Sequence, residues 1–328
     1  MLKAAVIGTG LMGSNHVRVL SETENVELVA IAESNNSILT KISKKYGCKP
    51  YSDYRKMIKN EKIDLICIAV PTSLHREVSL FAIKNKINVL IEKPIAATLE
   101  EGREIIDQAH KQGVKLMVGH IERFNPGIIE LKKRLKNGEL GRIFKVDVHR
   151  IGPFPTRVKD IGVVIDLAVH DLDIIRYLSD SEVKRIYAET EKKIHTGHED
   201  LLTALLKLQN GAICNLNINW LTPTKIRKLY LTGERGMFEI NYLTQDLYFY
   251  ENAEVKKDIG YFDVMMGVSE GKMVRFKIDR KEPLKAEIEH FIDCIENKSE
   301  PLVKGEDGLK AIELAHAIIR SSNENSVI

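Results

Sequence analysis

The stretch KAAVIGTGLMGSNHVRVL, residues 3–20, decides the fold of this chain. An apolar run leads into Gly8, Gly10 and Gly13, which have the spacing G-x-G-x-x-G, and a helix-compatible segment follows. Gly8 would permit a tight turn, Gly10 would let a pyrophosphate approach the backbone, and Gly13 would let helix and strand pack closely. The alternative is that the glycines only serve a turn. Because the motif lies between a predicted strand and a predicted helix, it favours a dinucleotide-binding unit.

The flanking residues indicate which dinucleotide is bound. The predicted helix start carries Leu11 and Met12, and its N–H groups and dipole would favour phosphate there. A second apolar run, VELVAIAE (26–33), ends in Glu33, whose carboxylate would accept hydrogen bonds from ribose hydroxyls and repel a 2′-phosphate. The sequence therefore predicts NAD as the cofactor in preference to NADP.

Three more apolar runs follow helix-compatible segments, at 63–72, 88–96 and 115–120. This alternation predicts parallel βαβ units and a doubly wound sheet, with the ligand crevice at the carboxyl ends of the strands. The residues expected to contact the cofactor at those ends are Pro71, Thr72, His75, Glu92 and Lys93.

Two of these residues have ordinary structural alternatives. A lysine at a strand end, such as Lys93, is usually a solvated cap, and an isolated histidine such as His75 is more often a surface or packing residue than a cofactor ligand. Their residue types alone leave both interpretations open.

The pattern changes from Arg123 onward. A helical segment at 125–140 precedes a strand at 141–152 and a loop rich in proline and charge. Successive strands without intervening helices then predict a mainly antiparallel sheet, and two amphipathic helices at 283–296 and 306–321 close the chain. We therefore expect an N-terminal α/β Rossmann domain, residues 1–121, and a C-terminal α+β domain with an open sheet, residues 122–328.

The segment DLAVHDLD, residues 166–173, concentrates ionisable groups among apolar neighbours. On an α-helix, Asp166, His170 and Asp173 would project from one side, whereas Asp171 would point elsewhere. Three roles fit such a face: metal ligands, an acid/base group steered by a carboxylate, or a buried ion pair with Arg176. Taken alone, the segment favours the structural role, because helical aspartate and histidine residues more often cap, pair or meet solvent than catalyse.

Composition narrows the class of protein. The 328 residues are 44% hydrophobic and 29% charged, with a net charge of +3, which is typical of an ordinary globular protein. Four scattered cysteines argue against a disulfide framework or structural zinc, and no basic run interleaved with aromatics suggests nucleic acid. No apolar run suits a membrane span or a signal peptide, so we expect a cytoplasmic protein.

The combined motifs resemble one family of proteins. They are GTGLMG (8–13), the strand ending in Glu33, PTSLH (71–75), EKP (92–94) and D-x-x-x-H-x-x-D (166–173). Over the whole chain this set resembles the glucose-fructose oxidoreductase / inositol dehydrogenase (Gfo/Idh/MocA) family of nicotinamide-dependent dehydrogenases. The resemblance implies that Lys93 and His170 act at the reacting carbon with Asp166 as their companion. The resemblance does not call for a metal ion, and it implies that the protein forms a homodimer or homotetramer.

Two further segments narrow the resemblance. VGHIERFNP (118–126) and IGPFPTRVKDIGVVIDLAVHDLD (151–173) are similar to members that oxidise the 3-hydroxyl of UDP-linked N-acetylhexosamines, in particular UDP-N-acetylglucosamine 3-dehydrogenases. The implied product is a 3-keto nucleotide sugar, the usual substrate of a pyridoxal-phosphate aminotransferase. The alternatives are another sugar or inositol dehydrogenase and a non-catalytic NAD-binding protein, although the latter would not need the lysine, histidine and aspartate together.

Alcohol oxidation assigns candidate roles to these side chains. A neutral His170 can accept the hydroxyl proton near pH 7, while the Lys93 ammonium can donate to the developing alkoxide. Asp166 can anchor a sugar hydroxyl or hold the imidazole. Which of Lys93 and His170 takes the proton is left open.

A nucleotide-sugar substrate also needs groups that bind a diphosphate. The planar guanidinium groups of Arg123 and Arg157 suit its oxygens, although a salt bridge with an acid such as Asp160 is equally compatible. Asn125 would contact the sugar or cap the helix that follows it. The predicted substrate contacts are Lys93, Arg123, Asn125, Arg157, Asp166 and His170.

Overall fold

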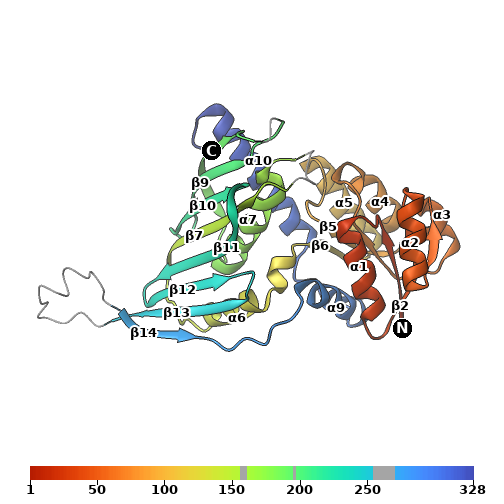
Figure 1. The fold of residues 1–328 in the computed structure, drawn as a ribbon, viewed down its shortest axis with the longest axis horizontal. Coiled ribbons are helices and arrows are strands. Elements are labelled where there is room, and N and C mark those ends of the chain that lie inside the picture. Colours follow the sequence, from red (N-terminus) through yellow and green to blue (C-terminus); the bar gives the residue numbers. More distant parts are fainter. Residues whose placement is uncertain (156–160, 195–196, 254–269) are drawn as a thin grey trace, which may run out of the picture. The chain divides into compact units, whose positions relative to one another are not determined.

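The chain divides into two compact units (Figure 1). The computed structural model describes residues 1–155, 161–194, 197–253 and 270–328. The first unit comprises Met1–Phe124 and Glu282–Glu313, and the second comprises Asn125–Lys281 and Leu314–Ile328. Residues 282–313 thus belong to the first compact unit, although the sequence-based division places them in the second domain.

A six-stranded parallel sheet forms the centre of the first unit, in the order β3-β2-β1-β4-β5-β6. This order confirms the predicted doubly wound sheet, in which the chain reverses direction between β1 and β4. The strands are β1 (Leu2–Ile7), β2 (Val26–Ala32), β3 (Lys49–Tyr51), β4 (Leu65–Ile68), β5 (Asn88–Glu92) and β6 (Leu116–Gly119).

Helices connect these strands and begin where the sequence supplies caps. The side chains of Asn35, Asp53 and Thr98 each accept a backbone N–H at the start of a helix. The helices of this unit are α1 (Leu11–Glu22), α2 (Asn36–Tyr46), α3 (Tyr54–Asn60), α4 (His75–Lys84), α5 (Leu99–Gln112), the 3₁₀ turns η1 (Thr72–Leu74) and η2 (Ile121–Phe124), α9 (Pro283–Glu296) and the first part of α10 (Gly305–Glu324).

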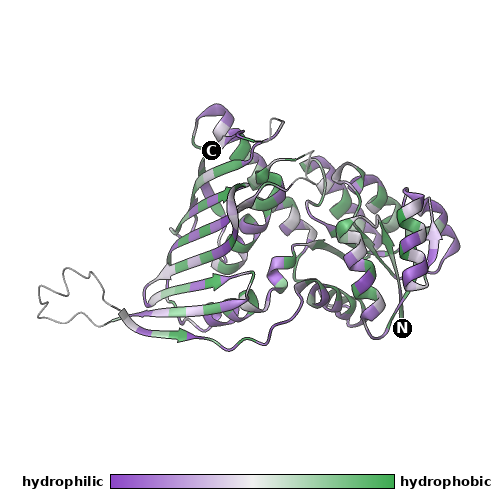
Figure 2. Ribbon diagram, viewed as in Figure 1, coloured by the Kyte–Doolittle hydropathy of each residue, from purple (hydrophilic) through white to green (hydrophobic). Residues whose placement is uncertain are grey.

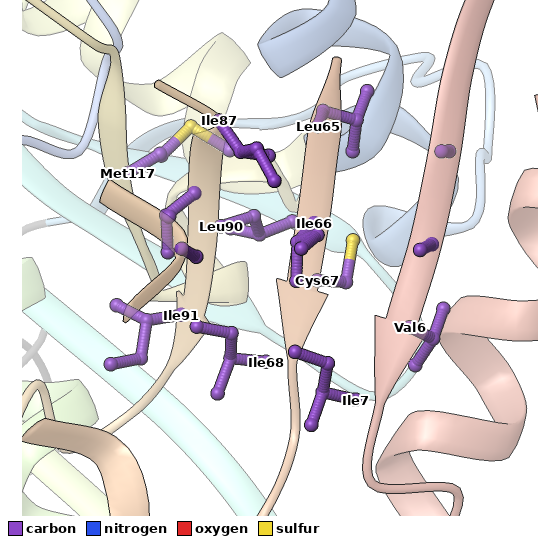
Figure 3. Packing of buried hydrophobic residues seen from close by; sticks show 14 of the residues in the cluster. Val6, Ile7, Leu65, Ile66, Cys67, Ile68, Ile87, Leu90, Ile91 and Met117 are labelled. Carbon is purple, nitrogen blue, oxygen red and sulfur yellow. The ribbon is translucent and has the colours of Figure 1, made fainter. Parts of the chain in front are cut away.

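The core of the first unit lies around its central strands. All four residues of β4 are buried, as are most residues of β1 and β5. Figure 3 shows Val6, Ile66 and Leu90 among the buried hydrophobic side chains that these strands contribute to the core. Parallel strands covered on both faces have nearly continuous apolar sequences. This burial explains why the apolar runs of the first 120 residues predict strands well.

The second unit contains an eight-stranded sheet in the order β14-β13-β12-β11-β7-β10-β9-β8. Its pairings are antiparallel except for β7 with β10, which confirms a mainly antiparallel sheet. The strands are β7 (Ile143–Pro153), β8 (Val183–Glu191), β9 (Leu201–Leu208), β10 (Ile213–Asn219), β11 (Leu221–Gly233), β12 (Gly236–Asn241), β13 (Asp246–Asn252) and β14 (Glu270–Arg275).

One face of this sheet is buried beneath helices. Figure 2 shows hydrophobic and hydrophilic residues alternating along its strands, as expected when one face packs and the other meets solvent. The helical elements of the unit are α6 (Pro126–Lys136), the π-helical turn η3 (Val164–Ala168), α7 (Val169–Ser179) and the last part of α10.

Candidate active site

The glycine-rich loop between β1 and α1 has the geometry of a dinucleotide-binding turn. Gly8 has a φ of +83°, and a Cβ there would lie 2.6 Å from the Ala69 carbonyl oxygen. A Cβ on Gly13 would lie 1.8 Å from the Gly8 carbonyl oxygen, so only glycine fits. In contrast, a Cβ on Gly10 would meet nothing within 4 Å. Gly8 and Gly13 are therefore required by the packing of the protein, whereas Gly10 borders open space.

The amino terminus of α1 can accept an anionic group. Gly10 is the N-cap residue, and no side chain in the described part of the chain caps this helix. Leu11 and Met12 in its first turn are exposed. Uncapped N–H groups and the positive end of the helix dipole favour phosphate. The loop therefore fits the pyrophosphate of a dinucleotide.

Glu33 follows β2 and is held beside this loop by several donors. Its carboxylate accepts the backbone N–H groups of Thr9 at 2.8 Å and Asn35 at 2.9 Å. The hydroxyls of Thr9 and Ser34 lie 3.2 and 3.3 Å away. Burial raises the pKa of Glu33, but these hydrogen bonds outweigh burial and bring the pKa below its ordinary value. The carboxylate therefore stays ionised at neutral pH.

A cavity of about 350 Å³ collects several of the predicted cofactor residues. Gly8, Gly10, Glu33 and Pro71 line it, which brings together the ends of β1, β2 and β4. The cavity thus lies at the carboxyl ends of the strands, where doubly wound sheets bind ligands.

The lining of this cavity also includes residues that the sequence did not reveal. Ser52 and Tyr54 follow β3, a three-residue strand too short to be recognised from its pattern. The Tyr54 hydroxyl donates to Glu77 at 2.7 Å, and Glu77 also pairs with Arg55. The rule that ligands bind at strand ends would have identified Ser52 and Tyr54 once β3 was known.

His75 connects two loops of the first unit. Its side chain is 1% exposed, with Nδ1 2.8 Å from the Pro94 carbonyl oxygen and Nε2 3.0 Å from that of Val70. Burial lowers its pKa. Both ring nitrogens thus lie beside carbonyl groups of the protein, and the cofactor contact of His75 stays a prediction. His75 instead ties the loop after β4, where Thr72 begins η1, to the loop after β5.

Glu92 and Lys93 stand at the end of β5. The Glu92 carboxylate lies 2.8 Å from Nε2 of His16, and its side chain is 13% exposed. Glu92 therefore has a partner within the protein, and its contact with the cofactor stays a prediction. Lys93 is half-buried and precedes Pro94 through a cis peptide bond. Lys93 therefore remains the candidate group at this strand end.

In the second unit, the segment DLAVHDLD does not begin as a regular α-helix. Asp166 lies in the π turn η3, and His170 lies in the first turn of α7. Asp166 is buried, with 9% exposure, whereas His170 is half-buried. Single π turns occur frequently at functional sites. The structure thus corrects the assumption of α-helical geometry at Asp166 and leaves the His170 ring partly accessible.

Buried charges anchor α7 to its sheet. Asp171 is fully buried and accepts a hydrogen bond from Nε of Arg150 on β7 at 2.6 Å. This ion pair gives Asp171, predicted to point away from the other charged residues of the segment, a structural role. Asp173 is also fully buried, and Arg176 donates to Glu182 at 2.9 and 2.7 Å.

Glu199 supports the start of the same helical segment. Its backbone carbonyl accepts the Val163 N–H at 2.8 Å, and its carboxylate accepts the Val164 N–H at 3.2 Å. A Cβ on Gly162 would lie 2.1 Å from the carboxylate carbon of Glu199, so the close approach depends on glycine. No sequence pattern signalled this cap, because Glu199 precedes the distant strand β9.

Arg123 and Asn125 have structural partners. Arg123 is 4% exposed, donates to the Leu302 carbonyl at 2.9 Å and pairs with Asp307 at 3.0 Å. Arg123 therefore has structural partners, and its contact with a diphosphate stays a prediction. Asn125 is 2% exposed and caps α6 by accepting the Gly127 N–H at 3.1 Å, as the capping alternative predicts.

Two of the residues discussed for the substrate site fall in a segment that the structure does not describe. Arg157 and its alternative partner Asp160 are not among the described residues. Within the described ranges, no group of three or more histidine, cysteine, aspartate or glutamate side chains is arranged to hold a metal ion. The same ranges contain no helix long and apolar enough to cross a membrane.

Two family models match the chain. Residues 2–120 match the GFO_IDH_MocA oxidoreductase family, NAD-binding Rossmann fold, and residues 132–328 match its C-terminal alpha/beta domain. A UDP-N-acetylglucosamine 3-dehydrogenase from Acidithiobacillus ferrooxidans is 25% identical over 90% of this chain and 88% of its own length. A myo-inositol 2-dehydrogenase from Thermotoga maritima is 25% identical over 98% of this chain and 97% of its own.

A solved structure shows the same fold. The UDP-N-acetylglucosamine 3-dehydrogenase GnnA from Acidithiobacillus ferrooxidans superposes with a TM-score of 0.87, at 23% identity and with 98% of each chain covered. Together with the glycine loop, Glu33 and the strand-end cavity, the two models assign the chain as a whole. It belongs to the Gfo/Idh/MocA oxidoreductase family and is a nicotinamide-dependent dehydrogenase that acts on a hydroxyl-bearing carbon.

Proposed function

We propose that the protein oxidises the 3-hydroxyl of UDP-N-acetylglucosamine to the 3-keto sugar with NAD. The observation that carries this proposal is Lys93, a half-buried ammonium group at the end of β5 in a unit built to hold a dinucleotide. The similarity to a named UDP-N-acetylglucosamine 3-dehydrogenase supports the choice of substrate.

Oxidation of a secondary alcohol removes a hydride from carbon and a proton from oxygen. The nicotinamide, when bound, accepts the hydride. We assign the hydroxyl proton to His170, because a neutral imidazole is a suitable base near pH 7. Lys93 donates a hydrogen bond to the oxygen as negative charge develops on it. Asp166, buried beside the start of α7, orients the imidazole or a sugar hydroxyl.

The preference for NAD over NADP rests on Glu33. Its carboxylate is ionised and fixed by Thr9 and Asn35 beside the cavity. An ionised carboxylate accepts hydrogen bonds from a ribose diol and repels a 2′-phosphate. Binding measurements with both dinucleotides would test this assignment, and equal affinities would contradict it.

The main test is a substrate panel followed by the absorbance of NADH. We expect turnover of UDP-N-acetylglucosamine, with the oxidised carbon located at C3 by NMR. Lys93→Met and His170→Ala should each fold and bind NAD but lose most turnover. A matched control is His110→Ala, because the His110 side chain is 70% exposed on α5. Normal activity in both Lys93 and His170 variants would refute the assigned chemistry.

A second candidate is an inositol or other sugar dehydrogenase. It is supported by the myo-inositol 2-dehydrogenase relative, which is equally similar and covers more of the chain. Arg123, a predicted diphosphate ligand, is occupied by Asp307, and this pairing also favours a substrate without a diphosphate. Turnover of free inositol without turnover of the nucleotide sugar would select this candidate.

We further propose that the open sheet face of the second unit joins copies of this chain in a homodimer or homotetramer. Tyr187, Leu205 and Ile213 project from this face with exposed fractions of 39%, 49% and 41%. Leu205→Glu should lower the molar mass measured by sedimentation. An unchanged mass would contradict the assignment of this face.

The proposed product also implies a second enzyme that uses it as a substrate. A 3-keto sugar is a substrate for a pyridoxal-phosphate aminotransferase, and amine formation in a coupled reaction would test that link. The cytoplasmic location remains a prediction from the sequence.

A further inference from the structure

The first unit buries three ionisable side chains beneath the strand end that carries Lys93. His16 comes from α1, Glu92 from β5 and Glu287 from α9. His16 is 1% exposed and Glu287 is fully buried. None of the three was assigned to the reaction above, and charged groups are rarely buried without a partner.

His16 and Glu92 form the first half of this cluster. Nε2 of His16 lies 2.8 Å from Oε1 of Glu92. A Cβ on Gly119, opposite Glu92 on β6, would lie 3.3 Å from Oε2, so glycine leaves room for the carboxylate. The contact has the distance of a charge-assisted hydrogen bond. The Glu92 carboxylate is thus held in one orientation by a helix on one side and a glycine on the other.

Glu287 forms the second half and has an unusual environment. Both of its carboxyl oxygens are buried without a hydrogen-bond partner in the described structure. A carboxylate removed from water without donors is strongly disfavoured and takes up a proton instead. Burial and the nearby Glu92 both raise the pKa of Glu287 well above its ordinary value, with His16 opposing them.

We propose that His16, Glu92 and Glu287 are positioning residues for Lys93. In this cluster His16 is an imidazolium, Glu92 is a carboxylate and Glu287 is an un-ionised carboxylic acid. The cluster carries no net charge, which allows its burial. Its one carboxylate, that of Glu92, directly precedes Lys93 in the chain and interacts electrostatically with the lysine ammonium. An un-ionised Glu287 leaves the His16 imidazolium paired with the Glu92 carboxylate alone.

The charges around Glu92 support this distribution of protons. Burial raises the pKa of Glu92, but His16 and then Lys93 outweigh burial and lower it. Burial lowers the pKa of His16, but the adjacent Cys67 sulfur and the Glu92 carboxylate raise it well above its ordinary value. The titratable groups that face the cluster come from every element around it: His16 on α1, Cys67 on β4, His75 on α4, Glu92 and Lys93 at β5, and Glu287 on α9.

The protonation state can be tested without any turnover. Infrared spectroscopy of the wild-type protein at neutral pH should show the carbonyl band of an un-ionised carboxylic acid. The band should shift when glutamate carboxyls carry ¹³C and should disappear in Glu287→Gln. Glu289→Gln, on the same helix with a side chain 50% exposed, is the matched control and should keep the band. Absence of a ¹³C-sensitive band from the wild-type protein would overturn the proposal, even if no variant folds.

The positioning role needs a kinetic readout and rests on the proposed function of Lys93. His16→Gln keeps an N–H donor for Glu92 but removes the positive charge, so Glu92 should take up a proton at higher pH. We expect the acid limb of kcat to move upward by about one pH unit or more, with the KM for NAD unchanged. An unmoved limb would overturn the positioning role. Full activity of Lys93→Met would instead refute the proposed function, while the infrared result would stand on its own.

Discussion

Substituting the loop glycines one at a time should separate cofactor binding from folding. Gly13→Ala places a Cβ 1.8 Å from the Gly8 carbonyl oxygen, a backbone atom that no side-chain rotation can move away. Overpacking costs about 1–3 kcal/mol, and backbone contact puts this variant at the upper end. At roughly 2–4 °C per kcal/mol, the melting temperature should fall by about 6–12 °C. Gly10→Ala meets nothing within 4 Å and should melt within about 2 °C of the wild type.

Gly10→Ala should weaken NAD binding even though it hardly changes the melting temperature. Its Cβ would enter the open space beside the α1 amino terminus, where the pyrophosphate is expected. A loss of about 1.4 kcal/mol of interaction with the phosphates corresponds to a tenfold higher dissociation constant for NAD. Differential scanning fluorimetry and calorimetric titration of each purified variant measure the two quantities. Normal NAD binding by Gly10→Ala, or a melting temperature as low as that of Gly13→Ala, would refute the separate roles of the two glycines.

Three further predictions concern charged groups. Glu33→Ala should raise the dissociation constant of NAD at least about tenfold, since each hydrogen bond to a charged group contributes roughly 1.5–3 kcal/mol. The difference in affinity between NAD and NADP should become smaller. Calorimetry showing an unchanged ratio of the two affinities would contradict this prediction. Asp246, whose pKa the Arg275 guanidinium lowers from 3.8 to about 2, stabilises the fold above pH 4 and loses that effect as pH falls through 2. Asp246→Asn should therefore lower the free energy of unfolding by about 1 kcal/mol at pH 7, after solvent screening, and by almost nothing near pH 2. If urea unfolding shows the same difference from the wild type at both pH values, this linkage is excluded. Asp171→Asn should lower the free energy of unfolding by about 3–5 kcal/mol, because it removes the negative charge that faces the buried Arg150 guanidinium. Replacing both partners by apolar residues should restore most of the loss, and a double variant no more stable than the single one would count against the ion pair.

The first unit was predictable in outline because its signals are local. Strands buried on both faces have continuous apolar runs, such as LICI in β4, and caps such as Thr98 lie next to the helix they start. The roles of Gly8 and Gly13 also follow from their spacing. Only the three-residue strand β3 escaped recognition, and Ser52 and Tyr54 of the cofactor cavity escaped with it.

Side-chain partners were predicted less well than backbone elements. His75, Glu92 and Arg123 occur in motifs or strand ends where a ligand was expected, yet each binds another part of the protein. Arg123, for example, pairs with Asp307, far along the chain. A residue type indicates what a side chain can bind but not which group the fold brings to it.

Except for β3, sequence alone was enough to predict the alternating elements of the first unit, the glycine loop, Glu33 as the acid beside it and Lys93 as the ion at the end of β5. These features depend on hydrophobic period and on neighbours within a few residues. Only the tertiary structure decided that Asp166 lies in a π turn, that α9 packs with the first unit, and that His16, Glu92 and Glu287 share one buried site. The reason is physical: burial and ion pairing depend on contacts between segments distant in the chain, and no local pattern encodes which segments meet.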